Sequence, residues 1–138
     1  MKIQKTIFST RLTGKERAAT TSSLFGVRFI WIASFAFDTA GGLCDDYDDG
    51  YWHYNALSNG SFYMSPAQAG GFHVVSANGF KGDMSADAFG IACCLTAYSL
   101  LSGSPDEGWA KQCAEHYHLL LAYVTERPEL RNVLLAID

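Results

Sequence analysis

The chain has 138 residues, of which 49% are hydrophobic and 17% are charged, and it contains 13 glycines and 3 prolines. This composition excludes a disordered or fibrous protein and predicts one compact domain, because a chain of this length can bury roughly two thirds of its unfolded surface. The formal net charge is −4, from 14 acidic and 10 basic side chains. Duplex DNA carries one charge per about 1.7 Å, so this charge density speaks against mimicry of DNA.

The charge is unevenly distributed along the chain. Residues 1–28 contain six basic residues and one acidic residue, whereas residues 29–138 contain four basic and thirteen acidic ones. We expect residues 1–23 to form a solvated, partly disordered basic arm in front of a single domain over residues 24–138. A competing hypothesis is that this arm binds nucleic acid, which predicts a DNA affinity that falls steeply with salt.

The first structured element is expected at residues 24–40, as a mostly buried helix closed by Gly41-Gly42. Its apolar stretch, Leu24 to Phe37, is shorter than the roughly 20 residues that cross a bilayer, so no membrane association is predicted. The four cysteines form no CxxC pair, which indicates reduced, packed thiols and a cytoplasmic protein.

Residues 51–66 predict a β-hairpin around Asn59-Gly60, a dipeptide typical of a two-residue turn with positive φ at both positions. In that register Leu57 faces Phe62 and Ala56 faces Tyr63, so both faces of the ribbon are apolar. Such a ribbon is either covered on both sides or keeps one aromatic side for a partner.

A second hairpin is expected at residues 72–83 around Asn78-Gly79, and helices follow it. Ser85 caps an apolar helix to about Ser102, residues 104–107 form a capping box for the next helix, and residues 128–136 can form a last short helix. The predicted fold is therefore α+β: a small antiparallel sheet of three to four strands, made from two hairpins, packed with an N-terminal helix and two to three C-terminal helices.

The sequence lacks the common signatures of catalysis. It contains no phosphate-binding GxxxxGK[ST] loop, no GxGxxG and no GxSxG motif. We predict a protein that is not an enzyme and has no cofactor or metal. The competing enzyme hypothesis takes His53, Asp83, Asp87 and His118 as an acid/base set, which requires these side chains to converge in one cleft.

Several motifs in one order resemble the ArdB/KlcA family of antirestriction proteins. Residues 50–66 resemble the family's Gly-Tyr-Trp-His-x-x-x-Leu-Ser-Asn-Gly-Gly-Phe-Tyr-Met-x-Pro segment, and residues 78–91 resemble its Asn-Gly-Phe and Leu-Ser-Ala-Asp-Ala-x-Gly-Ile segments. Tyr117-His118 and the ending at residues 128–138 also fit. Two departures are Ser61, in place of a second turn glycine, and Gly41-Gly42, where relatives continue a polar helix end.

The resemblance implies a plasmid or mobile-element protein that relieves type I restriction of incoming DNA in the host cytoplasm, with no enzymatic activity and no cofactor. Its expected partner is a component of the type I restriction-modification system or an associated host factor. Direct binding to DNA is not expected, and the protein is expected to be a monomer or a weak homodimer. The alternative is a small nucleic-acid- or protein-binding module of a mobile element unrelated to restriction.

The candidate interaction surface is the aromatic face of the first hairpin together with nearby carboxylates, since aromatic side chains are enriched in interface hot spots. Its members are Tyr51, Trp52, His53, Tyr63, Asp83, Asp87 and Asp138. The alternative is that the rings belong to the core. Asn59, Gly60, Asn78 and Gly79 are interpreted as turn residues required by backbone geometry.

Overall fold

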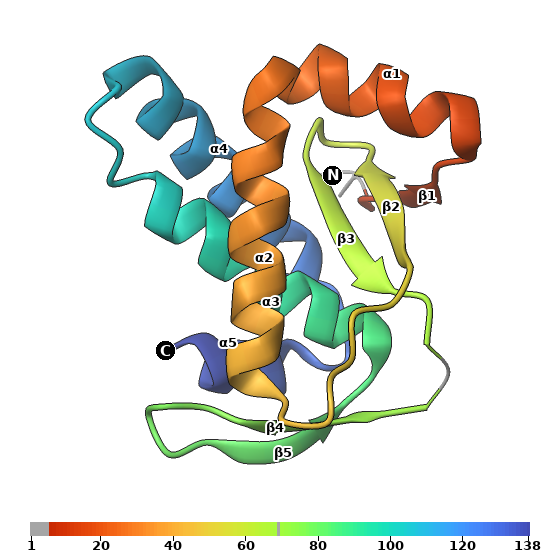
Figure 1. Ribbon diagram of the computed structural model, residues 1–138, viewed down its shortest axis with the longest axis vertical. Helices are drawn as coiled ribbons and strands as arrows, with labels where there is room; N and C mark the ends of the chain where they lie inside the picture. Colours follow the sequence, from red (N-terminus) through yellow and green to blue (C-terminus); the bar gives the residue numbers. More distant parts are fainter. Residues whose placement is uncertain (1–5, 69) are drawn as a thin grey trace, which may run out of the picture.

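The fold is α+β, as the sequence predicts. The computed structural model describes residues 6–68 and 70–138 (Figure 1). In chain order the elements are β1 (Ser9–Arg11), α1 (Gly14–Phe25), the 3₁₀ turn η1 (Gly26–Arg28), α2 (Phe29–Leu43), β2 (Trp52–Leu57), β3 (Phe62–Pro66), β4 (Phe72–Val75), β5 (Lys81–Met84), α3 (Ala86–Leu101), α4 (Glu107–Thr125) and α5 (Leu130–Ile137).

The strands form two separate antiparallel sheets instead of one. The first has the order β1-β2-β3, and the second is the β4-β5 ribbon. Both predicted hairpins are present, but the third strand of the first sheet comes from residues 9–11. The ribbon lies at the opposite end of the molecule from α1 (Figure 1).

Helix α3 is the centre of the core and contacts α2, α4, α5 and β3. It begins after Ser85, whose hydroxyl accepts a hydrogen bond from the amide of Ala88, as the sequence predicts. Phe89, Leu95 and Tyr98 are fully buried, because this helix is apolar on nearly every side.

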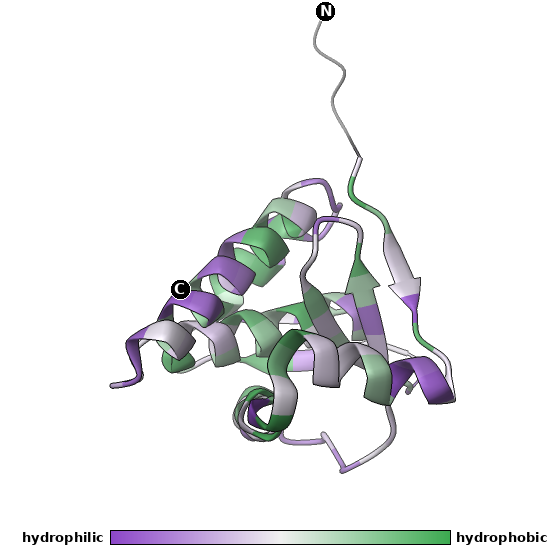
Figure 2. Ribbon diagram, turned by 90° about the horizontal axis from the view of Figure 1, so that it is seen from above, coloured by the Kyte–Doolittle hydropathy of each residue, from purple (hydrophilic) through white to green (hydrophobic). Residues whose placement is uncertain are grey.

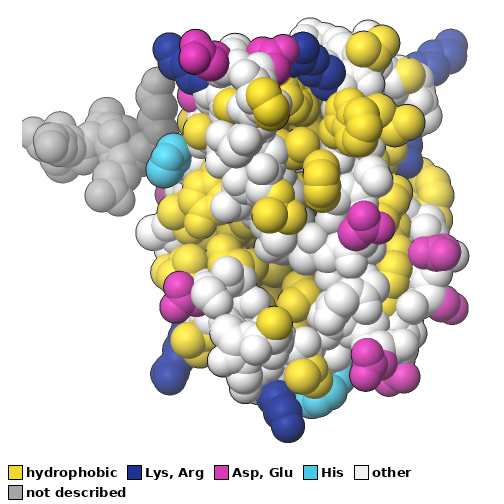
Figure 3. Space-filling model, turned by 60° about the vertical axis from the view of Figure 1, so that its left-hand side comes forward, with side chains coloured by type: hydrophobic (Ala, Val, Ile, Leu, Met, Phe, Trp, Pro, Cys, Tyr) yellow, Lys and Arg dark blue, Asp and Glu magenta, His cyan; other side chains and the backbone are white. Residues whose placement is uncertain are grey.

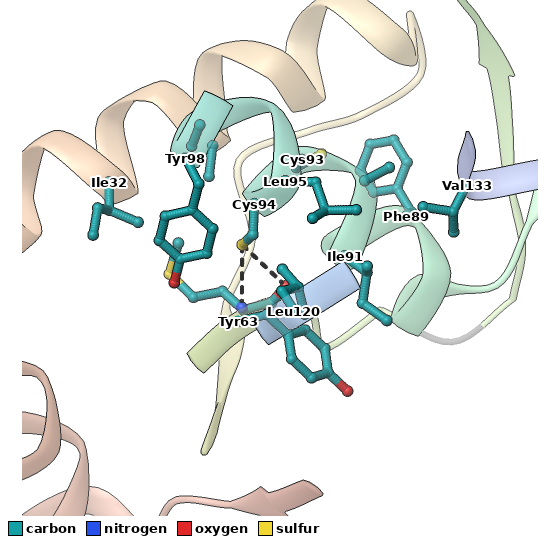
Figure 4. Close-up of a cluster of buried hydrophobic side chains, with 14 of the residues drawn as sticks. Ile32, Tyr63, Phe89, Ile91, Cys93, Cys94, Leu95, Tyr98, Leu120 and Val133 are labelled. Carbon is teal, nitrogen blue, oxygen red and sulfur yellow. Dashed lines mark hydrogen bonds between the residues drawn. The ribbon is translucent and has the colours of Figure 1, made fainter. Parts of the chain in front are cut away.

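Helix α3 also covers the free edge of β3. The Cys94 thiol lies 3.3 Å from the amide nitrogen of Met64 and accepts its hydrogen bond (Figure 4). The Tyr98 hydroxyl donates to the carbonyl of Phe62 at 2.6 Å. These side chains occupy backbone groups that an open strand edge would present to other chains.

The expectation of a disordered arm is corrected over residues 6–23. Ser9, Thr10 and Arg11 pair with Leu57, Ala56 and Asn55 of β2, and α1 begins with a capping box between Thr13 and Glu16. A polar strand of three residues is too short to show an alternation of apolar and polar residues in the sequence. Its pairing with β2 orders it in the structure. The part of the arm at residues 1–5 lies outside the described residues.

The predicted helix at residues 24–40 is also displaced. Residues 14–43 form a 30-residue helical stretch that is long and apolar enough to cross a membrane by length and composition. The chain changes direction within it, because Gly26 adopts φ 62° at the end of α1 (Figure 1). Helix α2 alone has 15 residues, about 22 Å, which is less than the apolar thickness of a bilayer. Gly41 and Gly42 lie inside this helix and do not end it.

The register of the first hairpin differs by one residue from the predicted one. Ala56 pairs with Phe62, and Asn55 pairs with Tyr63. The loop has three residues: the amide of Gly60 donates to the carbonyl of Leu57, and Gly60 alone has positive φ, 95°. This is a type I turn followed by a glycine bulge, in which asparagine keeps negative φ. A one-residue shift moves side chains to the other face, so Tyr54 joins Phe62 and Met64 instead of Tyr63.

The last two helices begin later than predicted. The N-cap of α4 is Asp106, whose carboxylate accepts from the amide of Trp109 at 3.1 Å, while Ser104 accepts from the amide of Asp106. Helix α5 begins at Leu130 rather than at Pro128. The start of α4 therefore follows the residue whose side chain caps it, whereas α5 begins without a side-chain cap.

Candidate functional site

The structure divides the predicted aromatic face between the core and the surface. Trp52 and Tyr63 are only 3% and 2% exposed, so their assignment to an interaction surface is wrong. The Trp52 indole donates to the Tyr47 hydroxyl at 2.8 Å, and the Tyr63 hydroxyl donates to Asp87 at 2.5 Å. Tyr63 also stacks on Tyr123. Both rings are core residues, because α2 and α3 cover the Trp52 side of the hairpin and α3 and α4 cover the Tyr63 side.

Tyr51 and His53 remain on the outside of the same strand. Tyr51 precedes β2 and is 61% exposed, and its ring meets the His53 ring edge to face at 5.7 Å between centroids. Among the four ring-bearing residues of the predicted surface, these two are the ones that a partner can reach.

Arg17, which no sequence pattern indicates, completes the arrangement. The guanidinium carbon of Arg17 lies 3.6 Å from the centroid of the Tyr54 ring and 4.8 Å from that of Tyr51. Its Nη1 also donates to the carbonyl of Trp52 at 2.9 Å. Helix α1 brings Arg17 to β2, because β1 pairs with β2 immediately before that helix starts. No short-range pattern signals this contact, since Arg17 and Tyr51 are far apart in sequence.

We define the β2 patch as Arg11, Arg17, Tyr51, His53 and Tyr54. Burial lowers the pKa of His53 below its ordinary value, and the charges of Arg11 and Arg17 lower it further. At neutral pH the cationic character therefore comes from the two arginines. The patch is positive on a chain whose net charge is negative.

The three predicted carboxylates have different partners. Asp83 of β5 pairs with His73 at 3.0 Å, and its side chain is 84% exposed. Asp87 lies in the first turn of α3 and binds the Tyr63 hydroxyl. Asp138 follows α5, and its carbonyl accepts from the Asn78 side chain. None of these contacts involves a residue of the β2 patch.

The two Asn-Gly pairs lie in the hairpin turns and also attach these turns to helices. The Asn59 amide group donates to the carbonyl of Leu119 in α4 at 2.8 Å, and Asn78 donates to that of Leu135 in α5 at 2.9 Å. Each asparagine oxygen accepts the backbone amide two residues later. Gly60 and Gly79 have φ of 95° and 96°, which favours glycine.

The proposed acid/base set has different neighbours at each member. His53 contacts Tyr51, Asp83 pairs with His73, Asp87 binds Tyr63 and His118 contacts Tyr117. The hollows beside the two carboxylates are also different ones. Across residues 6–68 and 70–138, no three His, Cys, Asp or Glu side chains are placed to hold a metal ion.

Comparisons with known proteins agree on one family. The family described as Antirestriction protein matches residues 45–138. Antirestriction protein KlcA of Escherichia coli is 35% identical over 146 residues, covering 100% of this chain and 98% of the relative. A second Antirestriction protein KlcA of Escherichia coli is 38% identical over 98 residues, which cover 70% of this chain and 69% of that relative.

The fold is similar to that of a solved structure as well. This structure, of KlcA and ArdB proteins, is described as showing a novel fold and antirestriction activity against type I DNA restriction systems in vivo but not in vitro. It matches with a TM-score of 0.91 and 31% sequence identity, covering 100% of this chain and 99% of the other.

Proposed function

This chain belongs to the Antirestriction protein family, and we propose that it relieves type I restriction of incoming DNA as a non-enzymatic binding protein that uses the β2 patch. The proposal places its action in the cytoplasm, where incoming DNA meets the restriction system. The observation that carries it is the position of Arg17, whose guanidinium lies over the rings of Tyr51 and Tyr54.

The chemistry of the patch supports binding more than turnover. Tyrosine and arginine are among the residue types that contribute most energy to protein interfaces, and rigid side chains lose little entropy on binding. The hydrogen bond to Trp52 and the two rings hold Arg17 in place before a partner arrives. The residues proposed as an acid/base set contact different neighbours, which supports no common reaction centre.

The sign of the patch favours an acidic protein surface as the partner. Arg11 and Arg17 make it cationic, which is opposite to the charge that a decoy of DNA needs. The solved relatives act in vivo but not in vitro, which favours a cellular factor that supports restriction over a simple blocker of the purified enzyme. We therefore propose that the patch binds such a factor or a component that restriction recruits in the cell.

The test is protection of unmodified phage DNA in cells that carry a type I restriction system. Tyr51→Ala and Arg11→Ala change exposed side chains of the patch, while Lys81→Ala and Arg131→Ala change exposed cations on β5 and α5 as matched controls. We expect the patch variants to lower plating efficiency at least roughly tenfold, as loss of a hot spot does, and the controls to protect like the parent.

Folding and abundance of each variant are checked by circular dichroism and immunoblotting. If folded Tyr51→Ala and Arg11→Ala protect as well as the parent, the β2 patch is not the working surface. If the parent gives no protection at all against type I systems, the proposed function itself fails.

A further inference from the structure

Helix α2 carries an apolar stripe on the side that faces away from the protein. The outer α2 stripe begins at Val27 of η1 and continues along α2 with Ile30, Trp31, Ser34, Phe37, Asp38 and Gly41. Val27 is 92% exposed, Ile30 is 67% exposed and Trp31 is 56% exposed. Figure 2 looks along α2, which lies at the outer edge of the molecule and is coloured hydrophobic over much of its surface. Hydrophobic side chains also gather in the upper part of the face shown in Figure 3.

The fold itself does not require these side chains. The opposite side of α2 supplies the core, where Ile32, Ala36 and Ala40 are completely buried against the rest of the protein. These three recur every fourth residue, so they form one face of the helix, and the exposed residues form the other. A contiguous patch of exposed apolar side chains often marks an interaction surface.

Gly41 points to a contact with something outside the chain. It lies inside α2 without the positive φ that favours glycine, and a side chain there would meet no atom within 4 Å. Neither backbone geometry nor internal packing therefore needs glycine, which destabilises a helix relative to alanine. Its missing side chain leaves a notch on the outer stripe that a bulky residue of another molecule can enter.

The charges at the two ends of the stripe are complementary to each other. Arg28 borders its beginning, where it pairs with Asp106 at 2.5 Å and lies over the Trp109 ring. Asp38 lies near its end and has no ion-pair partner in the part of the chain that the structure describes. Two copies of the stripe placed antiparallel bring Arg28 of each towards Asp38 of the other, whereas a parallel arrangement brings like charges together.

We propose that a second copy of this chain docks on the outer α2 stripe, with the two helices antiparallel and crossing near Ser34. Val27 of each copy then lies opposite Gly41 of the other, and Trp31 lies opposite Phe37, so the Val27 side chain meets the notch. The stripe from Val27 to Gly41 is about 21 Å long, and one helix pair covers less than the roughly 800 Å² per partner of a standard stable interface. We therefore expect a weak dimer that forms only as the concentration rises. It uses no residue of the β2 patch, so its test is independent of the proposed function.

Sedimentation velocity of the full chain over a series of micromolar concentrations tests the proposal first. The parent is expected to shift from monomer to dimer as concentration rises, with a blue shift of tryptophan emission, because Trp31 is exposed while Trp52 and Trp109 are buried. Trp31→Glu is expected to remain monomeric. Val75→Glu changes a residue of β4 that is also exposed, 42%, and should associate like the parent.

A charge exchange tests the antiparallel geometry. Arg28→Glu and Asp38→Lys each place like charges opposite one another in a homodimer, and each is expected to weaken association at least roughly fivefold. In an equimolar mixture of the two variants every facing pair is opposite in sign, so the mixture should associate like the parent. Circular dichroism verifies the fold, since Asp106 keeps its cap on Trp109 without Arg28.

Gly41→Leu separates a role in docking from a role in folding. It is expected to raise the melting temperature, because leucine favours the helix, and to weaken association, because it fills the notch. A parent that stays monomeric at every concentration overturns the proposal, as does a mixture of charge variants that fails to associate while both single variants do. Binding to phosphatidylcholine vesicles without self-association also overturns it and identifies a lipid surface as the occupant.

Discussion

The two hairpins have the same turn but different surroundings. In each, a glycine at φ 95° or 96° closes a type I turn, and an asparagine links the turn to a helix carbonyl. Every residue of β3 is buried, whereas β4 alternates between buried and exposed positions. The same local chemistry therefore produces a core element in one place and a surface ribbon in the other, and the difference comes from what packs against each strand.

The largest difference in stability is expected between substitutions at two glycines, one in α3 against β3 and one within β5. A methyl group at Gly90 of α3 would lie 2.2 Å from the carbonyl oxygen of Met64 and 2.6 Å from the Cα of Ser65, both backbone atoms of β3. Gly90→Ala must push α3 off the strand edge and is expected to lower the free energy of unfolding by about 3 kcal/mol or more. At Gly82 of β5 the methyl group meets the Phe80 ring at 2.8 Å, and this side chain can move.

Gly82→Ala is accordingly expected to cost less than about 1 kcal/mol. Urea unfolding followed by circular dichroism measures both variants. Equal losses would mean that α3 does not rest on β3 as closely as the structure indicates.

The next contrast concerns the asparagines that attach the turns to helices. Asn59 is partly buried, and its replacement leaves the Leu119 carbonyl and the Ser61 amide without this partner. Asn59→Ala is expected to cost about 1–2 kcal/mol. Asn78 is exposed, so water replaces its hydrogen bonds, and Asn78→Ala is expected to cost about 0.5–1 kcal/mol. The same unfolding measurement checks the order, and a larger loss at Asn78 would contradict it.

Substitution of either turn glycine should lower the free energy of unfolding by the same amount. Gly60 and Gly79 share the same φ, and a side chain at either would meet no atom within 4 Å. Gly60→Ala and Gly79→Ala are each expected to cost about 1 kcal/mol, from backbone strain alone. Thermal unfolding of the two variants in parallel tests this, and a difference larger than about 0.5 kcal/mol would show that the surroundings also act on the turn.

The parts of the fold that the sequence predicted well are those decided locally. The two turns follow from Asn-Gly, and the beginning of α3 follows from the hydroxyl of Ser85. The register of the first hairpin does not follow from the dipeptide, because Asn-Gly closes two-residue and three-residue loops, and the choice between them moves every side chain to the other face. The burial of Tyr63 was missed for this reason.

The candidate site depended on contacts distant in sequence. The aromatic composition predicts a surface role for Tyr51, Trp52 and His53. Tyr51 and His53 are on the outside, whereas Trp52 is covered by Phe37 and Phe89 from two helices. Arg17 was missed because a short polar strand brings it to β2, and nothing around residue 17 indicates a partner at residue 51. Composition therefore identified the strand, and only tertiary packing identified which of its side chains a partner can reach.

The smallest expected effect is a pH dependence at the first hairpin. His116 of α4 is 7% exposed, and its Nδ1 lies 3.1 Å from the Ser61 hydroxyl beside the turn. Burial lowers the pKa of His116 below its ordinary value, so the unfolded chain takes up a proton at higher pH than the folded one. Stability is therefore present above the unfolded pKa of about 6.5 and falls as the pH drops through the folded pKa.

Urea unfolding at a series of pH values between about 7.5 and 5.5 measures this slope. His53 acts in the same direction, since its pKa is also lowered, so His116→Gln and His53→Gln are compared separately. The slope of the His116→Gln variant should be flatter than that of the parent, whatever its stability at neutral pH. An unchanged slope would contradict a role of His116 in the acid sensitivity, and a flatter slope in His53→Gln would then assign it to the β2 patch.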